Sequence, residues 1–143
     1  MLSRIAKEVD GLRDRGAVVI IENKKVGLIK REREGSTYYV FPGGGVEEGE
    51  TPDQTARREA FEELGVIVKI KRLFTTFEHD GIQYYYLAER LDGTFGSGSG
   101  DEYVDRSRDR GSYTPVWVGI ERLSTIDLRP RQVGLKVQSS VVN

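Results

Sequence analysis

The segment Gly44 to Val66 decides the fold and reads GGVEEGETPDQTARREAFEELGV. Its central part predicts a helix, because Thr51 and Gln54 form a capping box and Pro52 falls at the first helical position. Gly65 supplies the other end, since glycine readily adopts the left-handed conformation that closes a helix. We therefore expect a helix of at most about four turns that begins at Pro52 and stops just before Gly65.

Three carboxylates follow one margin of this helix, beside an apolar seam that should face a sheet. They belong to Glu59, Glu62 and Glu63. Like charges three or four residues apart destabilise a helix by roughly 0.2–0.5 kcal/mol per pair, so a compensating cation is expected. Mg²⁺ takes oxygen ligands and is usually held by a few carboxylates, substrate phosphates and water. The alternative is a solvated acidic face with Arg57 and Arg58 as ion-pair partners.

The same segment resembles the Nudix box, and every charged and glycine position of that pattern is filled. The matching residues are Gly44, Glu50, Arg58, Glu59, Glu62, Glu63 and Gly65. The resemblance extends from about Arg15 to Arg129, and no subfamily can be assigned from it. It implies an α/β fold of the Nudix type, an α/β/α sandwich with a central mixed β-sheet, as a single domain over residues 1–143.

The resemblance also implies roles for the residues of the box. Glu59, Glu62 and Glu63 would be ligands of Mg²⁺, with Mn²⁺ as a substitute, and the main-chain carbonyl of Gly43 would be a further ligand. Glu50 and Arg58 would form an ion pair that orients Arg58 and fixes the loop against the helix. The remaining support of the site would come from Gly44 and Gly65.

The reaction implied by the family is metal-assisted hydrolysis of a diphosphate. A carboxylate takes the proton of the attacking water, and either Glu59 or Glu102 would be this base, with Arg58 as a further catalytic residue. The expected substrate is a nucleoside triphosphate or a dinucleoside polyphosphate. The alternative is an inactive module of the Nudix fold that senses a nucleotide or contacts a protein.

Composition fits one sizeable core, with 22 basic and 23 acidic residues among 143 and a net charge of −1. The lack of a basic excess argues against general nucleic-acid binding. The absence of cysteine excludes disulfides and thiolate metal sites. No stretch is apolar for long enough to cross a membrane, so a cytoplasmic location is expected. Nudix proteins are often dimers, and the residues neither favour nor exclude a homodimer.

Alternation and turn residues outside the box predict strands and two short helices. We expect hairpins around residue 24 and at Asp80-Gly81, and a strand that leads directly into a tight turn at the glycines after Pro42. The expected strands cover residues 17–21, 26–29, 38–41, 66–77, 82–88 and 113–118, and the expected helices residues 120–123 and 130–137.

The segment 91–112 is too long for an ordinary connector, and such loops are either lids over a site or disordered. As a lid it would bring Arg106 to substrate phosphates and Glu102 to the reacting water. Arg31 could also meet a phosphate, and Tyr84 could stack on a base. His79, the only histidine, is expected at the surface beside a hairpin turn.

Overall fold

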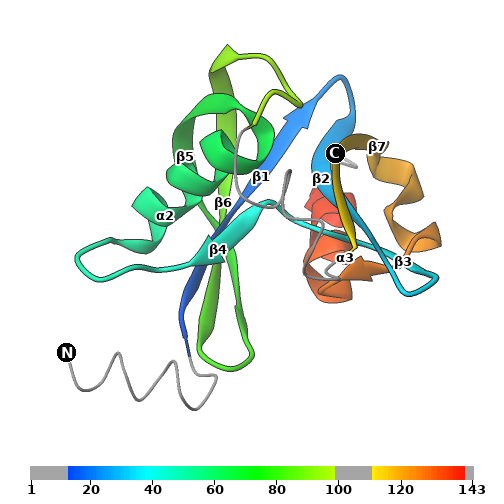
Figure 1. Ribbon diagram of the computed structural model, residues 1–143, viewed down its shortest axis with the longest axis horizontal. Helices are drawn as coiled ribbons and strands as arrows, with labels where there is room; N and C mark the ends of the chain where they lie inside the picture. The colour runs from blue at the N-terminus through cyan, green and yellow to red at the C-terminus, as the bar shows by residue number, and fades with distance from the viewer. Residues whose placement is uncertain (1–12, 99–110, 141–143) are drawn as a thin grey trace.

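The structure is a computed structural model that describes residues 13–98 and 111–140. Its strands form one curled, mixed, eight-stranded sheet with helices on both faces, so the predicted α/β/α sandwich is confirmed (Figure 1). In chain order the elements are β1 (Arg15–Glu22), β2 (Lys25–Arg33), β3 (Ser36–Val40), β4 (Gly43–Gly45), α2 (Pro52–Glu59), η1 (Ala60–Leu64), β5 (Val66–Glu78), β6 (Ile82–Gly93), β7 (Ser112–Gly119), η3 (Ile120–Thr125), β8 (Leu128–Arg129) and α3 (Arg131–Ser140).

The sheet divides into two halves because β1 and β2 pair only next to their connecting turn, at Ile21 and Glu22. Beyond that point β1 pairs in parallel with β6 and antiparallel with β4, which gives a first half in the order β5-β6-β1-β4. Strand β2 pairs with β7 and β3, which gives a second half in the order β7-β2-β3-β8. Figure 1 shows the two halves diverging from β1 and β2.

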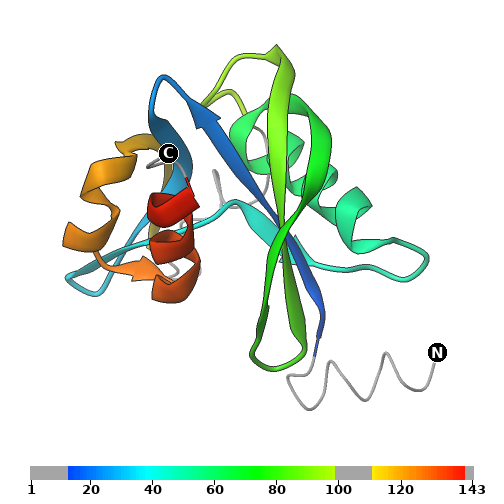
Figure 2. The same ribbon diagram turned by 180° about the vertical axis from the view of Figure 1, so that it is seen from behind.

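Strand β1 separates two hydrophobic cores. Its Val18 and Ile20 pack with apolar residues of α2 and η1, whereas Ala17 and Val19 pack in a second core that includes residues of η3 and α3. This follows from the alternation of side chains along a strand and requires both faces of β1 to be apolar. Figure 2 shows α3 from behind, on the side of the sheet away from α2.

The predicted helix is present, but its last turn is of the π type instead of α. The helix begins at Pro52 as expected, and the main-chain N–H of Thr51 donates to the side chain of Gln54 (2.9 Å). The π turn covers Ala60–Leu64 and ends at Gly65, which has the predicted left-handed conformation (φ 77°). A π turn holds more residues than an α turn, so Glu62 and Glu63 are rotated relative to Glu59 away from the positions that a regular α-helix would give them.

The other predicted strands and helices are confirmed with shifted ends, and two strands were missed. The glycines after Pro42 were expected to form a turn, but Gly43–Gly45 form β4, which pairs antiparallel with β1. A Cβ atom on Gly43 would lie 2.6 Å from that of Ala17, so only glycine lets the two strands approach this closely. The second missed strand is the two-residue β8. Within the described ranges, no helix is long and apolar enough to cross a bilayer.

Leu64→Ala should lower the free energy of unfolding by about 2–5 kcal/mol, because Leu64 is fully buried between η1 and the sheet. The matched control is Leu91→Ala, since Leu91 is 61% exposed and its truncation should change stability by less than about 0.5 kcal/mol. Urea unfolding of both variants and the wild type measures the difference. Equal losses for the two leucines would contradict the packing described for the helix.

Candidate active site at the carboxylates of α2

Arg58 is the centre of the cluster of charged residues on α2. Its Nε and Nη2 donate to the two oxygens of Glu50, at 2.7 and 3.1 Å, in a bidentate ion pair. Its Nη1 donates to Glu59 (2.8 Å) and to Glu62 (3.2 Å), and its Nη2 also donates to the carbonyl of Gly45 (3.2 Å). One guanidinium therefore holds the loop, β4 and two of the three helix carboxylates together. The hydrogen bond to Glu50, followed by the nearby negative charge of Glu59, raises the pKa of Arg58.

Both carboxylate oxygens of Glu50 accept hydrogen bonds from protein groups. Besides the two from Arg58, it accepts one from the hydroxyl of Thr55 (2.6 Å) and one from the main-chain N–H of Glu47 (3.0 Å). Three of these bonds go to Oε1 and one goes to Oε2, so protein groups hold the carboxylate at both oxygens. Chiefly because of Arg58, the pKa of Glu50 falls to about 2. The structure thus contains the expected Glu50–Arg58 ion pair, and the role of this pair in supporting a site stays a prediction.

Thr55 is a residue that the sequence analysis did not identify. It is completely buried, and its hydroxyl lies between the carboxylate of Glu50 and the carbonyl of Thr51. The first turns of α2 can sit this deep because β1 has a glycine beneath them. A Cβ atom on Gly16 would lie 2.2 Å from the carbonyl oxygen of Pro52 and 3.0 Å from the Cβ of Thr55. The sequence feature that could have indicated Thr55 is its position, one helical turn after the N-cap residue Thr51.

Glu59 and Glu63 are buried carboxylates, each 8% exposed, that lie against the glycines of β4. The main-chain N–H of Gly43 donates to Glu63 (2.8 Å), which ties β4 to the end of the helix. A Cβ atom on Gly44 would lie 2.2 Å from the carboxylate of Glu59. Gly44 therefore leaves the space in which the carboxylate of Glu59 sits.

These residues fit a hard divalent cation in their chemistry. The donors are carboxylate oxygens and glycine carbonyls, the ligands that Mg²⁺ and Mn²⁺ prefer. Across residues 13–98 and 111–140, however, no three His, Cys, Asp or Glu side chains are already gathered as a metal-binding group. Arg58 lies between Glu59 and Glu62 and supplies the positive charge there.

A pocket of about 410 Å³ opens next to β4, between the two halves of the sheet. Its wall from the first half includes Arg15 of β1, which pairs with Gly45, and Gln83 and Tyr85 of β6. The Tyr85 hydroxyl donates to the amide oxygen of Gln83 (2.7 Å), and burial raises the pKa of Tyr85 to about 12. The volume is within the range of sites for small ligands. The pocket thus combines aromatic, amide and arginine groups beside the glycine strand.

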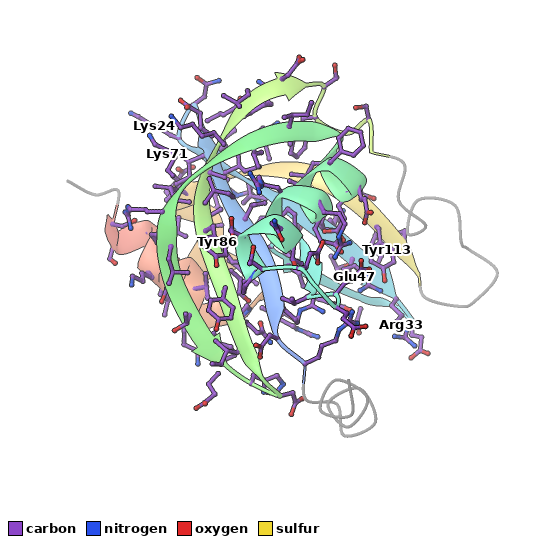
Figure 3. The ribbon with its side chains drawn as sticks, turned by 90° about the vertical axis from the view of Figure 1, so that its left-hand side faces the viewer. Lys24, Arg33, Glu47, Lys71, Tyr86 and Tyr113 are labelled. Carbon is purple, nitrogen blue, oxygen red and sulfur yellow. The ribbon has the colours of Figure 1, made fainter. Side chains whose placement is uncertain are left out.

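The structure separates the predicted substrate-binding residues. Tyr84 lies on the other face of β6 from Tyr85, stacked on Tyr86 at 6.4 Å between ring centroids, and it does not line the pocket. Figure 3 labels Tyr86, on the face of β6 beside α2. Arg31 stacks on the ring of Tyr113 (3.6 Å to the centroid) in the second half of the sheet. His79 is exposed as predicted, yet it also forms part of the pocket rim.

Glu102 and Arg106 lie outside the described residues. The described start of the loop 91–112 packs on the end of the helix. A Cβ atom on Gly98 would lie 2.4 Å from the carbonyl oxygen of Glu62, so Gly98 lies against the main chain of η1.

Comparison with known proteins gives one family. The sequence model of the NUDIX domain matches residues 12–135. The RNA pyrophosphohydrolase of Actinobacillus succinogenes is 41% identical over 66 residues, which are 46% of this chain and 33% of the relative. The RNA pyrophosphohydrolase of Photobacterium profundum is 37% identical over 70 residues, 49% of this chain and 40% of the relative. The matches thus span well under half the length of these relatives.

Solved structures show the same fold. A NUDIX hydrolase from Nitrosomonas europaea superposes with a TM-score of 0.68 at 18% identity, over 90% of this chain and 88% of the other. A structure from a study of MutT from Aliivibrio salmonicida and Vibrio cholerae superposes with a TM-score of 0.68 at 23% identity, over 89% of this chain and 96% of the other.

The depressed pKa of Glu50 makes stability depend on pH. The ion pair should stabilise the fold fully above the ordinary glutamate pKa of 4.5, and this contribution should be lost as the pH falls towards about 2. Allowing for solvent screening of a partly exposed pair, the loss should be about 1–2 kcal/mol. Urea unfolding between neutral and acidic pH should show a shallower pH dependence for Glu50→Gln than for the wild type.

Glu78→Gln is the control for this measurement, because Glu78 is an exposed carboxylate on β5. Its pH dependence should follow that of the wild type. Identical acid dependence in Glu50→Gln and the wild type would show that the ion pair does not stabilise the folded state.

Proposed function

The chain belongs to the Nudix family, and on this basis we propose that it is a metal-dependent pyrophosphohydrolase that cleaves the diphosphate bond of a nucleoside triphosphate or a dinucleoside polyphosphate. The observation that carries the proposal is the cluster around Arg58. It combines one carboxylate that protein groups hold at both oxygens, Glu50, with two carboxylates that accept hydrogen bonds from the same guanidinium nitrogen, Glu59 and Glu62. Glu50 would therefore support the site by holding Arg58, whereas Glu59 and Glu62 would take part in the chemistry.

Glu59, Glu62, Glu63 and the carbonyl of Gly43 would hold Mg²⁺ or Mn²⁺, which when bound neutralises diphosphate charge and makes water a stronger nucleophile. Glu62 is the most accessible of the three carboxylates, with 43% of its side chain exposed against 10% for Glu59. A cation would therefore reach Glu62 first from solvent. Arg58, held by Glu50, keeps Glu59 and Glu62 on the same side of the helix.

Glu59 or Glu102 would accept the proton of the attacking water. The carboxylate of Glu59 is buried beside Gly44 and receives a hydrogen bond from Arg58 at 2.8 Å. Both constraints fix its position, and a fixed carboxylate can hold a water molecule in line with a phosphorus atom. The arrangement supports Glu59 as the base within the described residues.

The pocket beside β4 would take the nucleoside. Phe41 and Tyr85 form an edge-to-face pair (5.5 Å between centroids) that gives the pocket an apolar wall. The amide nitrogen of Gln83 donates one N–H to the carbonyl of His79 (3.4 Å), which leaves its second N–H as a donor to a base. Since the pocket borders β1 where it pairs with β4, a nucleoside there would place its phosphates near the glycines.

The second candidate is a nucleotide-sensing or protein-interaction module without turnover. The observation in its favour is that Arg58 already forms ion pairs with Glu59 and Glu62, so part of their negative charge is balanced by a protein group. A cytoplasmic location and a homodimer also remain proposals that rest on the family.

Glu62→Gln should lower metal-dependent turnover by at least about 10–100-fold, because the change removes a carboxylate ligand. The measurement is release of phosphate and mononucleotide from nucleoside triphosphates, dinucleoside polyphosphates, nucleotide sugars and ADP-ribose, with Mg²⁺ and with chelator. Glu89→Gln, at an exposed position on β6, is the matched control and should behave as the wild type.

Binding of Mn²⁺ without substrate, followed by electron paramagnetic resonance, should weaken in Glu62→Gln and not in Glu89→Gln. Turnover that survives chelation would contradict metal dependence. Nucleotide binding by calorimetry without turnover of any compound would establish the sensing module instead.

A further inference from the structure

Arg13, two residues before β1, carries a half-buried guanidinium group that has no partner among the residues that the structure describes. Its Nε atom is buried without a hydrogen bond, and its two Nη atoms are open to solvent and form no ion pair with those residues. Arg58 differs in this respect, because Glu50 binds its guanidinium with two hydrogen bonds. Burial of a charged group without an acceptor is unfavourable, and a bound anion would supply the missing acceptor.

The main chain at Arg13 is fixed from two sides. The N–H of Arg13 donates to the carbonyl of Asp80 (2.8 Å), and the N–H of Ile82 donates to the carboxylate of Asp14 (3.0 Å). On the other side, the N–H of Val46 donates to the carbonyl of Asp14 (2.9 Å). Figure 1 shows the start of β1 beside the turn that joins β5 and β6. The side chain of Arg13 thus extends from a backbone that is bound to this turn and to the end of β4.

The guanidinium of Arg13 lies flat over Gly45. A Cβ atom on Gly45 would lie 2.4 Å from Cζ, 2.5 Å from Nε and 2.7 Å from Nη1 of Arg13. Gly45 has no positive φ, so the glycine is required here by the space that the guanidinium takes and not by the backbone. Gly45 is also not one of the residues that match the Nudix box, so this contact belongs to this chain and not to the box pattern.

Arg13 and the buried carboxylate of Glu59 lie on opposite faces of β4. A Cβ atom on Gly44 would point at Glu59, and side chains of neighbouring residues in a strand point to opposite faces. Among the described strands, β4 pairs with β1 alone, so its other edge is free of strands. A ligand that runs along this edge can therefore contact groups on both faces of β4.

The face that holds Arg13 is the face of the pocket beside β4. Gly45 pairs with Arg15 in the antiparallel ladder, and paired residues direct their side chains to the same face. Arg15 lines the pocket, as does Ala17 two residues further along β1. The guanidinium of Arg13 therefore lies beside Arg15, at the end of the pocket that borders β4.

We propose that Arg13 binds the phosphate group nearest to the nucleoside of the substrate and thereby selects nucleotides by this phosphate. A guanidinium held flat against Gly45 presents its N–H edge in a fixed orientation, which suits a phosphate group. Gly45 is about 7 Å along β4 from Gly43, so one polyphosphate can contact both Arg13 and a cation at the carboxylates. The inference rests on the proposed function for the position of the nucleoside and for the hydrolysis step.

Calorimetry in the presence of chelator measures this contact without hydrolysis. Adenosine, guanosine, cytidine and uridine are each titrated, along with their 5′-monophosphates, into the wild type and Arg13→Gln. The wild type should bind the preferred monophosphate about 10–100-fold more tightly than its nucleoside, as expected for a hydrogen-bonded contact to a charged group. Arg13→Gln should lose this preference and keep the affinity for the nucleoside. The matched control is Arg122→Gln, at an exposed position on η3, which should behave as the wild type.

Gly45→Ala tests the same contact from the other side. Its methyl group would displace the guanidinium of Arg13 and leave the carbonyl that accepts from Arg58 in place. This variant should lose the preference for the monophosphate as Arg13→Gln does. The double variant should lose no more than either single variant, because both changes remove one contact.

In the hydrolysis assay Arg13→Gln should raise KM by about 10–100-fold and keep kcat within about threefold, because the contact is present before and during the reaction. Glu62→Gln should lower turnover instead. A preference for the monophosphate that depends on Arg13, without turnover of any compound, supports the inference while the hydrolysis proposal alone fails. Equal affinity of the wild type for nucleosides and monophosphates would overturn the inference. So would an unchanged preference in an Arg13→Gln protein that thermal unfolding shows to be folded.

Discussion

The hydrogen bonds of Arg58 are the interaction on which the site depends. One guanidinium joins Glu50 in the loop, Gly45 in β4, and Glu59 and Glu62 on the helix. Planar geometry suits this role, because arginine can bind one carboxylate with two parallel bonds and still donate to others. Repulsion among the carboxylates would otherwise oppose the helix locally. The same contacts that offset this repulsion also tie the loop, β4 and the helix together.

Glycines make this cluster compact. Gly16 lets the first turns of α2 sit on β1, Gly43 lets β4 pair closely with β1, and Gly44 leaves room for the carboxylate of Glu59. None of these three has positive φ, so their value lies in the missing side chain and not in unusual backbone conformation. Close approach of helix, strand and carboxylate then brings main-chain groups and acidic side chains to one place.

Local signals in the sequence were enough to predict the ends of the helix, whereas the fold class and the Glu50–Arg58 pair were expected from the resemblance to the Nudix family. Local signals were not enough where the structure of a segment depends on residues far away in the sequence. Strand β4 forms by pairing with β1, and Thr55 can be buried because Gly16 leaves room beneath it. The side chains of Tyr84, Tyr85 and Tyr86 alternate between the two faces of β6. The sequence does not show which of these side chains lines the pocket, and in the structure it is Tyr85. The stacking of Arg31 against Tyr113 and Tyr38 depends on the register of three strands, which the periodicity along one strand does not predict.

Strand β1 contributes side chains to both hydrophobic cores, and this limits the insertions and deletions that it can accept. Neighbouring residues of β1 belong to different cores, so inserting or deleting a single residue would send every later side chain of the strand to the wrong one. Point substitutions among aliphatic residues are tolerated far more readily. Length variation should therefore accumulate in the turn at Asn23 and Lys24 and in the segments that connect the elements, while the length of β1 itself is fixed.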